Sequence, residues 1–269
     1  QRTTLLRHAR AARFAYNWGL ARRMEEYEKT GKSSNAIGLH RQLNVLKKTD
    51  FPWMYEVSKC APQEALRDLD RAYKNFFEGR AKYPKFRSRK RGIGSFRLTG
   101  SIAVFHDSVQ LPRIGRVRLK EKGYLPTEGV HILSATASEK AGRWFVSVQV
   151  EEEIEALINV GPIVGVDVGI SPLAKVSDGA VIENPKALAR FEWKRKRLQR
   201  SLSRKMKDSR NRLDAKTRLA KCDLRIASIR RDAQHKATTM LATTKSVIGV
   251  ESLNVAGLLK NHCLAKQLA

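Results

Sequence analysis

Apolar residues recur at near-helical spacing through the first third of the chain. One apolar face continues among arginines as far as Met24, and Gly31 ends the run. A second helix is predicted over 39–46 and a third over 62–77, where Pro62 suits the first turn of a helix. The pattern therefore predicts an N-terminal helical bundle.

Between residues 95 and 153 the apolar spacing changes to two. Short apolar segments are separated by Pro112, Gly115 and Gly123, and the segment 144–151 alternates apolar and polar side chains. Several short antiparallel strands of this kind predict a small β-barrel, which is a common platform for oligonucleotides.

From residue 162 onward the pattern combines strands with two long helices. Its first strand is apolar except for one acid, Asp167, and its last strand runs directly into Glu251. The predicted order is strand 163–170, strand 173–177, a hairpin turn at 178–179, strand 180–182, helices 188–204 and 210–244, and strand 247–250.

The charge of the chain indicates its partner. Lys and Arg total 53 against 26 Asp and Glu, and the resulting net charge of +27 is spread through the sequence. A polyanion relieves the self-repulsion of so much like charge, which makes nucleic acid the first candidate. A membrane partner is not favoured, because the sequence shows no basic amphipathic helix with a bulky apolar face, no lipidation motif and no long apolar run.

The cysteines and the two ends of the chain carry less information. Cys60, Cys222 and Cys263 are odd in number and never form a C-x-x-C pair, so alone they build neither a disulfide framework nor a zinc site. We expect reduced cysteines and a cytoplasmic protein, or a nuclear one if the host has a nucleus. Because the chain begins at Gln1 and stops at Ala269 within a basic stretch, we also expect a fragment.

Two cationic segments are candidate nucleic-acid contacts. A charge run is usually a solvated face or linker, but aromatic residues interleaved with cations suit stacking beside phosphate contacts. The density of cations on the helix 188–204 favours contact with RNA or heteroduplex phosphates. The predicted contacts are Tyr83, Lys85, Phe86, Arg87 and Arg89 in the first segment, and Lys194, Arg195, Arg197, Arg200, Arg204 and Lys205 in the second.

Asp167 and Glu251 are the candidate catalytic acids. A carboxylate within a buried apolar strand is unfavourable unless it is paired, and a divalent cation pairs it strongly. The element order is that of an RNase H-type domain, in which the first and fourth strands lie side by side, so the two acids would meet. Such sites hold two Mg²⁺ ions about 3.5 to 4 Å apart that activate water and stabilise the leaving oxygen. The pair therefore predicts phosphodiester hydrolysis.

An alternative is that Asp167 opens a phosphate-binding hairpin, as in actin-like ATPases. The motif Gly-x-Asp-x-Gly alone fits both kinds of protein. The ATPases need further glycine-rich phosphate loops, which the sequence does not show, and they are seldom this basic. The second acid at Glu251, beyond two cationic helices, favours the nuclease.

Several motifs together resemble TnpB, the transposon-encoded OrfB protein of the IS200/IS605 group and a relative of the Cas12 effectors. The resemblance covers nearly the whole chain. It rests on Gly165–Ile170, Ser177–Gly179, Glu183–Pro185, Leu198–Lys205, His235–Lys236 and Val250–Val255, and upstream on Arg13–Asn17, Ala72–Phe77 and Tyr83–Arg87.

The resemblance implies an α+β multidomain protein with an N-terminal helical bundle, a small antiparallel β-barrel and an RNase H-like α/β domain. Residues 1–84 would form the recognition lobe, 85–158 the wedge domain, and 159–269 an incomplete RuvC nuclease domain. Lys59 and Gln63 fall where family members contact the DNA motif next to the target. The third catalytic acid and the zinc ribbon, with its Zn²⁺, would follow Leu268, and the first wedge strand would precede Gln1.

By the same resemblance the function is RNA-guided DNA cleavage with Mg²⁺ in a prokaryotic cytoplasm, near the nucleoid. A guide RNA would pair with target DNA while the protein supplies a cationic channel. We expect this incomplete chain to bind RNA and DNA better than it cuts them. The alternatives are a cleavage-inactive RNA-guided DNA-binding protein or pseudogene product, and a DNA-joining transposase with the same fold.

Overall fold

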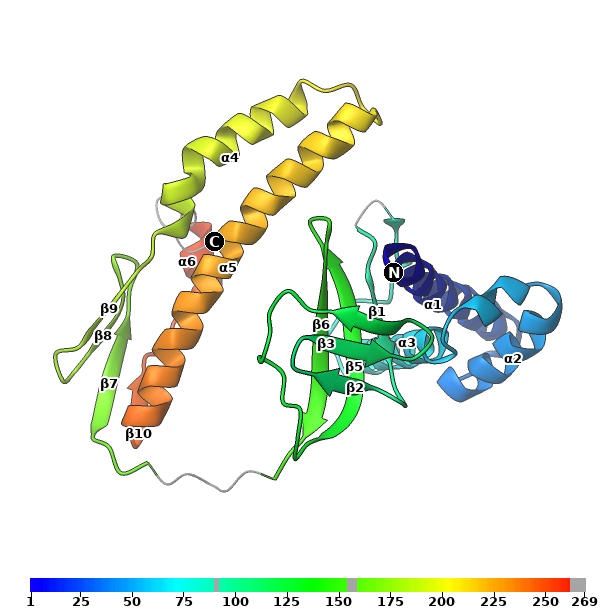
Figure 1. Ribbon diagram of the computed structural model, residues 1–269, viewed down its shortest axis with the longest axis horizontal. Coiled ribbons are helices and arrows are strands. Elements are labelled where there is room, and N and C mark those ends of the chain that lie inside the picture. The colour runs from blue at the N-terminus through cyan, green and yellow to red at the C-terminus, as the bar shows by residue number, and fades with distance from the viewer. Residues whose placement is uncertain (90–91, 154–158, 262–269) are drawn as a thin grey trace. The chain divides into compact units, whose positions relative to one another are not determined.

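The structure is a computed structural model that describes residues 1–89, 92–153 and 159–261. The chain divides into two compact units, residues 1–153 and 154–269 (Figure 1). Cys263 lies outside the described residues. No helix in the described ranges is long and apolar enough to span a membrane.

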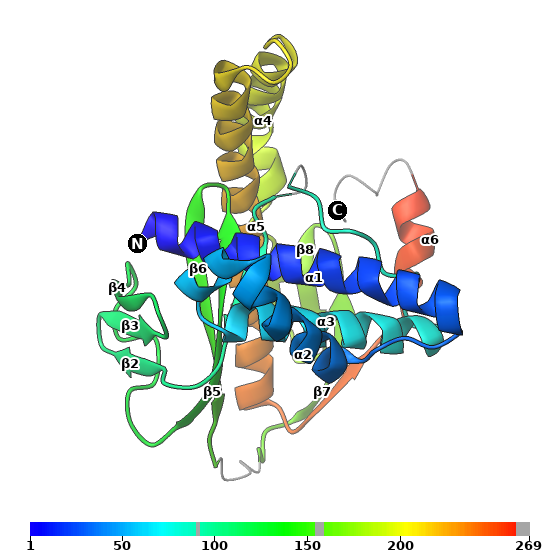
Figure 2. The same cartoon turned by 90° about the vertical axis from the view of Figure 1, so that its right-hand side faces the viewer.

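The three predicted helices of the first unit are confirmed. They are α1 (Arg2–Thr30), α2 (Ala36–Thr49) and α3 (Cys60–Phe77), and a 3-10 helix, η1 (Pro52–Glu56), connects the last two. Gly31 ends α1 with φ of 69°, a left-handed conformation that glycine adopts without steric cost, and its N–H donates to the Tyr27 carbonyl. The two views of the ribbon show α1 and α3 side by side (Figures 1 and 2).

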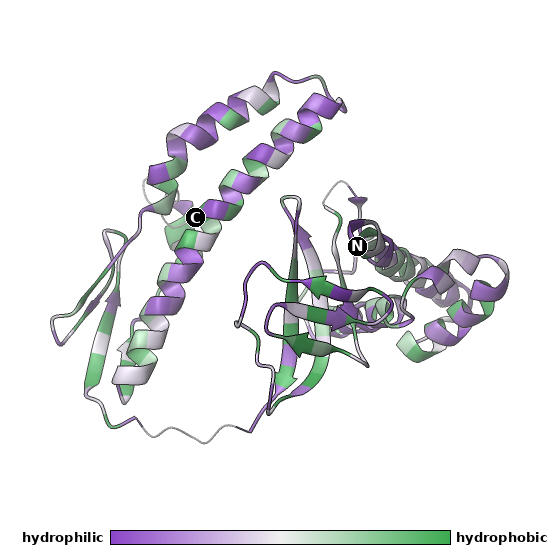
Figure 3. Ribbon diagram, in the orientation of Figure 1, coloured by the Kyte–Doolittle hydropathy of each residue, from purple (hydrophilic) through white to green (hydrophobic). Residues whose placement is uncertain are grey.

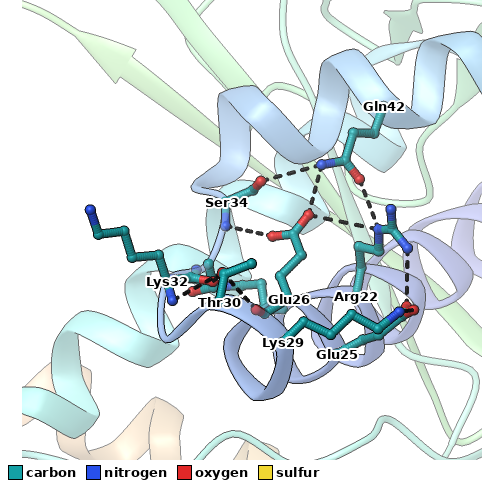
Figure 4. Close-up of polar contacts among 10 residues, drawn as sticks. Arg22, Glu25, Glu26, Lys29, Thr30, Lys32, Ser34 and Gln42 are labelled. Atoms are coloured by element: carbon teal, nitrogen blue, oxygen red, sulfur yellow. Dashed lines mark hydrogen bonds and ion pairs between the residues drawn. The ribbon is translucent and has the colours of Figure 1, made fainter.

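A polar network joins the end of α1 to the beginning of α2 (Figure 4). Glu26 accepts hydrogen bonds from the Ser34 N–H at 2.7 Å and from Gln42 Nε2 at 2.8 Å. Arg22 lies 3.7 Å from the same carboxylate. Because one carboxylate satisfies groups from both helices, the network fixes the turn between them.

The strands of the first unit differ from the predicted barrel. Within the described residues they form two separate three-stranded antiparallel sheets, with no closed barrel. The strands β2 to β4 have only three or four residues each, and β5 and β6 pair along their length as one hairpin, so no strand joins the two sheets. One sheet has the order β1 (Ser95–Leu98), β5 (His131–Lys140), β6 (Arg143–Glu151), and the other β2 (Ala103–Phe105), β3 (Ser108–Leu111), β4 (Gly115–Arg118).

Helices and sheets of the first unit share one hydrophobic core. Leu39, Leu66 and Leu69 from the helices cluster with Phe96 and Leu98 from β1. Gly19 of α1 lies against α3, because a Cβ atom at this position would lie 2.6 Å from Leu66 Cδ2. The absence of a side chain at Gly19 therefore lets the two helices pack tightly.

His8 is a fully buried polar residue in this core. Its Nε2 accepts a hydrogen bond from the Ser58 N–H at 2.9 Å, so Nδ1 carries the proton and donates to the Thr4 carbonyl at 2.8 Å. Burial lowers the pKa of His8, although the bond to Thr4 opposes this effect. The folded protein therefore holds His8 in its neutral form.

We expect the free energy of unfolding of the first unit to fall as the pH drops below about 6.5, the ordinary histidine pKa. Unfolded His8 gains a proton there that folded His8 resists, so its stabilising contribution is complete above that pH and is lost below it. Chemical denaturation at several pH values should show a shallower acid slope for His8→Gln. His40, whose pKa burial also lowers, remains in both proteins as an internal reference. Equal slopes would contradict the prediction.

The second unit contains one four-stranded sheet with the order β10-β7-β8-β9. β10 pairs with β7 in parallel, and the other neighbours pair antiparallel, so the predicted adjacency of the first and last strands is confirmed. The elements are β7 (Ile163–Val168), β8 (Pro172–Val176), β9 (Val181–Glu183), α4 (Ala187–Ser203), α5 (Arg210–Thr244), β10 (Val247–Val250) and α6 (Val255–Lys260).

One face of this sheet is buried and the other is exposed. Val164 and Val166 of β7 pack with Leu241 of α5, whereas Ile163 and Val247 on the opposite face are 74% and 54% exposed. A separate small cluster, which includes Ala187, Cys222 and Ile226, joins α4 to α5.

The end of α5 is fastened to the sheet. Lys245 Nζ lies 2.5 Å from the Asp178 carboxylate, and this hydrogen bond holds the pKa of Asp178 below its usual range. The Ser246 N–H donates to the Pro162 carbonyl at 3.4 Å. These contacts tie the turn between β8 and β9, the start of β7 and the end of α5 together.

Gly161 occupies a position beside α5 that has no room for a side chain. A Cβ atom there would overlap the Thr244 carbonyl. We expect Gly161→Ala to destabilise the second unit by about 1–3 kcal/mol, the usual range for overpacking. Hydrogen exchange of β7 amides should accelerate. Gly165→Ala is the matched control, because nothing lies within 4 Å of its added Cβ, and equal exchange in both variants would refute the expectation.

Candidate active site and nucleic-acid surfaces

The parallel pairing of β7 and β10 brings Asp167 and Glu251 together. Val166 is the register partner of Val250, so the next residue on each strand lies at the same end of the sheet. Asp167 raises the pKa of Glu251, so the two carboxyl groups interact. Two acids far apart in the sequence thus form one pair, as the element order predicts.

The burial predicted for Asp167 is wrong. Asp167 is exposed and lies next to the end of β7, because the strand buries only the face that carries Val164 and Val166. The alternation along β7 turns the acid toward the uncovered face of the sheet. Exposure leaves the acid pair accessible to a cation and to substrate.

Asp167 is the main influence on the pKa of Glu251. The hydrogen bond to Asp167 and the like charge of that residue raise the pKa of Glu251, with a smaller contribution from desolvation. A divalent cation bound between the two carboxylates would relieve the repulsion between them. In the described residues no group of three or more His, Cys, Asp or Glu side chains is arranged to hold a metal ion.

We expect Asp167→Ala to lower the pKa of Glu251 toward its ordinary value, because the variant removes both the hydrogen bond and the neighbouring charge. An NMR titration of the Glu251 carboxyl carbon measures the shift. Glu183→Ala is the control, since Glu183 is not among the groups that raise this pKa. An unchanged Glu251 titration in Asp167→Ala would mean that the two acids do not interact in solution.

The acid pair borders a cavity of about 560 Å³. Gly165 and Gly249 line it, and their lack of side chains leaves the sheet surface open beside the acids. Lys175 is the register partner of Asp167 on β8 and places a cation next to the pair. Lys175 was not among the predicted site residues, although its position on a strand paired with β7 was the available signal.

The segment around Tyr83 is held against the helices of the first unit. The Arg87 guanidinium lies 3.8 Å from the centre of the Tyr16 ring and 3.4 Å from the Asp68 carboxylate. The Tyr83 hydroxyl is hydrogen-bonded to the Tyr73 hydroxyl at 3.0 Å. These contacts give both side chains a structural role, whereas Lys85, Phe86 and Arg89 are exposed.

Lys59 and Gln63 lie one turn apart at the start of α3. The Gln63 N–H donates to the Lys59 carbonyl at 3.3 Å, Lys59 is exposed, and Gln63 is half-buried. Both side chains therefore belong to one surface at the beginning of the helix.

The predicted cationic contacts on α4 and just after it differ in whether another side chain contacts them. Arg195 Nε lies 2.7 Å from Asp223 of α5, and the Arg197 guanidinium lies 4.8 Å from the centre of the Trp193 ring. The ribbon coloured by hydropathy shows α4 as largely hydrophilic (Figure 3). The remaining predicted contacts, Lys194, Arg200, Arg204 and Lys205, are exposed.

Comparison with known families gives two matches. Residues 145–262 match the OrfB_IS605 family, described as "Probable transposase", and residues 1–32 match HTH_OrfB_IS605, described as "Helix-turn-helix domain". In the structure the latter residues form the single helix α1 and its Gly31 cap.

Curated relatives match along nearly the whole chain. "Putative RNA-guided DNA endonuclease InsQ" of Escherichia coli (strain K12) is 33% identical over 268 residues, which cover 97% of this chain and 65% of that protein. "Putative RNA-guided DNA endonuclease" of Streptomyces pristinaespiralis is 33% identical over 273 residues, covering 100% of this chain and 68% of that protein. The chain thus spans about two thirds of the length of each.

Proposed function

We propose a function from one premise: the chain belongs to the OrfB family of IS605-type transposon proteins. The function is RNA-guided cleavage of DNA by metal-dependent phosphodiester hydrolysis at Asp167 and Glu251. In this proposal residues 159–269 are the RuvC-type nuclease domain, a guide RNA selects the target DNA, and Mg²⁺ is the metal.

The observation that carries the proposal is the meeting of Asp167 and Glu251 at the ends of two parallel strands. Two carboxylates that repel each other on an open sheet face suit a hard divalent cation, which prefers oxygen ligands. The bound metal would activate water and stabilise the leaving oxygen of the phosphodiester. The donor set therefore fits Mg²⁺.

The chain's own residues contribute binding and orientation. Gly165 and Gly249 leave space for a sugar-phosphate backbone beside the acids, and the ammonium group of Lys175 is available to a phosphate oxygen. Relatives named as RNA-guided endonucleases support a guide RNA and a target DNA as the partners. The net charge of +27 supports contact with both polyanions.

A second candidate function is guide-directed DNA binding without cleavage. It is favoured by the number of acids, because the described residues bring only two carboxylates together at this site and provide no larger metal-binding group. Two carboxylates give a metal ion fewer fixed ligands than a three-acid site would.

One experiment separates the two functions. The longest polypeptide that the gene encodes is purified with its guide RNA and incubated with matching and mismatched target DNA, in Mg²⁺ or in EDTA. Cleavage of the matching DNA in Mg²⁺ alone supports the nuclease. Guide-directed binding without cleavage supports the second function. Cleavage of the mismatched DNA, or cleavage in EDTA, would contradict both functions.

A further inference from the structure

A groove on the first unit lies outside the residues assigned to function above. It has a volume of about 680 Å³, and it is lined from α1 by Arg7, Arg10, Arg13, Phe14 and Trp18 and from η1 by Trp53. Asn17, Glu56 and Val57 complete the lining. Its cationic and aromatic side chains are the combination that single-stranded nucleic acid requires for phosphate and base contacts.

The aromatic part of the groove is held in place by ring contacts. Phe14 meets Trp53 edge to face at 5.3 Å between ring centres, and it meets Phe51 in the same manner at 4.8 Å. Trp53 nevertheless remains 39% exposed. A large ring that packs against another ring and is still partly exposed can stack on a planar ligand with little loss of conformational entropy.

The three arginines of the groove differ in their availability. Arg10 is exposed and makes no ion pair or hydrogen bond with any described residue. Arg13 donates only a long hydrogen bond, 3.4 Å, to the Ile93 carbonyl. Arg7 is paired with Glu56 at 2.8 Å, with both side chains 56% exposed. Arg10 and Arg13 can therefore bind an anion without breaking a short internal ion pair.

A second cavity shares one lining residue, Arg13, with the first. It has a volume of about 220 Å³ and is also lined by Arg13, together with Lys85 and Phe86. Both of these are exposed and belong to the segment in which cations and aromatic residues alternate. Arg13 lines both cavities, and we call the two cavities together the track.

We propose that this track binds single-stranded nucleic acid, with one unpaired base stacked on Trp53 and the adjacent phosphates on Arg10 and Arg13. In a duplex the bases are stacked on each other and their faces are not available, so a fixed aromatic ring favours the single strand. An acidic peptide would satisfy the arginines but would leave the Trp53 ring without a matching planar group.

The track belongs to the first unit and shares no residue with the acid pair of the second, and binding to it requires neither metal nor cleavage. The test is therefore made in EDTA, with the chain and a labelled oligothymidylate of about ten nucleotides, within the site sizes known for single-strand binding surfaces. Fluorescence anisotropy gives the Kd, and quenching of tryptophan emission reports stacking. A chain that does not bind oligothymidylate would contradict the track but not the proposed nuclease function. A protein that does not cleave DNA would contradict the nuclease function but not the track.

We expect Trp53→Ala to weaken oligothymidylate binding about tenfold and to abolish most of the quenching, since base stacking on an aromatic ring has that order of effect. Trp53→Phe should retain most of the affinity. The matched control is Tyr55→Ala, which removes a 57% exposed ring from the same 3-10 helix outside the track. An abasic oligomer should bind wild type and Trp53→Ala equally, because it has phosphates but no base.

Arg10→Ala should weaken both the oligothymidylate and the abasic oligomer, and it should reduce the slope of log K against log salt by about 0.7, the value for one phosphate contact on a single strand. Arg41→Ala, an exposed arginine on α2, removes the same charge elsewhere. Unchanged oligothymidylate affinity in Trp53→Ala, or equal weakening for the abasic oligomer, would overturn the proposal. If polyglutamate displaced the labelled oligothymidylate as well as unlabelled oligothymidylate does, the track would be a nonspecific cationic surface, and the proposal would be wrong.

Discussion

Asp167→Ala is expected to lower the rate of guide-directed DNA cleavage by about a thousandfold or more. Loss of this carboxylate removes half of the observed acid pair and, with it, the several kcal/mol by which a bound metal stabilises the transition state. About 4 kcal/mol corresponds to a thousandfold change in rate. Single-turnover cleavage in Mg²⁺ with saturating guide RNA measures the effect on the chemical step.

The control for this variant is Asp232→Ala. Asp232 is an exposed acid on α5 that pairs with Lys236 at 2.9 Å, so its removal changes the charge of the same unit without touching the site. Binding of guide RNA and target DNA should remain within about twofold of wild type for both variants, because neither acid is a phosphate contact. Undiminished cutting by Asp167→Ala would remove the acid pair from the mechanism.

Leu66→Ala is expected to lower the free energy of unfolding of the first unit by about 2–5 kcal/mol. Leu66 is fully buried, and its Cδ2 lies against Gly19 of α1. Truncation removes buried apolar surface and leaves a cavity that two tightly packed helices cannot close. Urea unfolding followed by tryptophan fluorescence measures the change, since three of the four tryptophans belong to this unit.

Ile37→Ala provides the comparison, because Ile37 lies on α2 with 65% of its surface exposed. Its truncation should change stability by no more than about 0.5 kcal/mol, as is usual for surface positions. Equal losses in the two variants would mean that the helical core is not the main source of stability in this unit.

Helices whose ends are set by a nearby capping side chain or glycine could be predicted from the sequence. Ser209 begins α5, and its Oγ accepts a hydrogen bond from the Arg212 N–H at 3.2 Å, which is an ordinary capping signal. Gly31 ends α1 by its left-handed conformation. The pairing of Asp167 with Glu251 was also predictable, because it follows from the order of strands and helices.

Features that depend on distant residues were not predictable in this way. Closure of a barrel requires pairing between strands separated in sequence, and local alternation carries no information about it. The strand β5 was not singled out, since Ser, Thr and Ala occupy much of it. Arg87 looked like a free phosphate contact, yet Tyr16 and Asp68, which hold it, belong to helices far away in the sequence.

The helix α5 is long, and contacts at its C-terminal end anchor it to the sheet. Its 35 residues give it a length of about 52 Å. Lys245 and Ser246 anchor it where β10 begins, while its first turns lie far along the helix beside the cations of α4. The same contacts set where β10 begins, so the anchor of α5 also positions the strand that leads to Glu251.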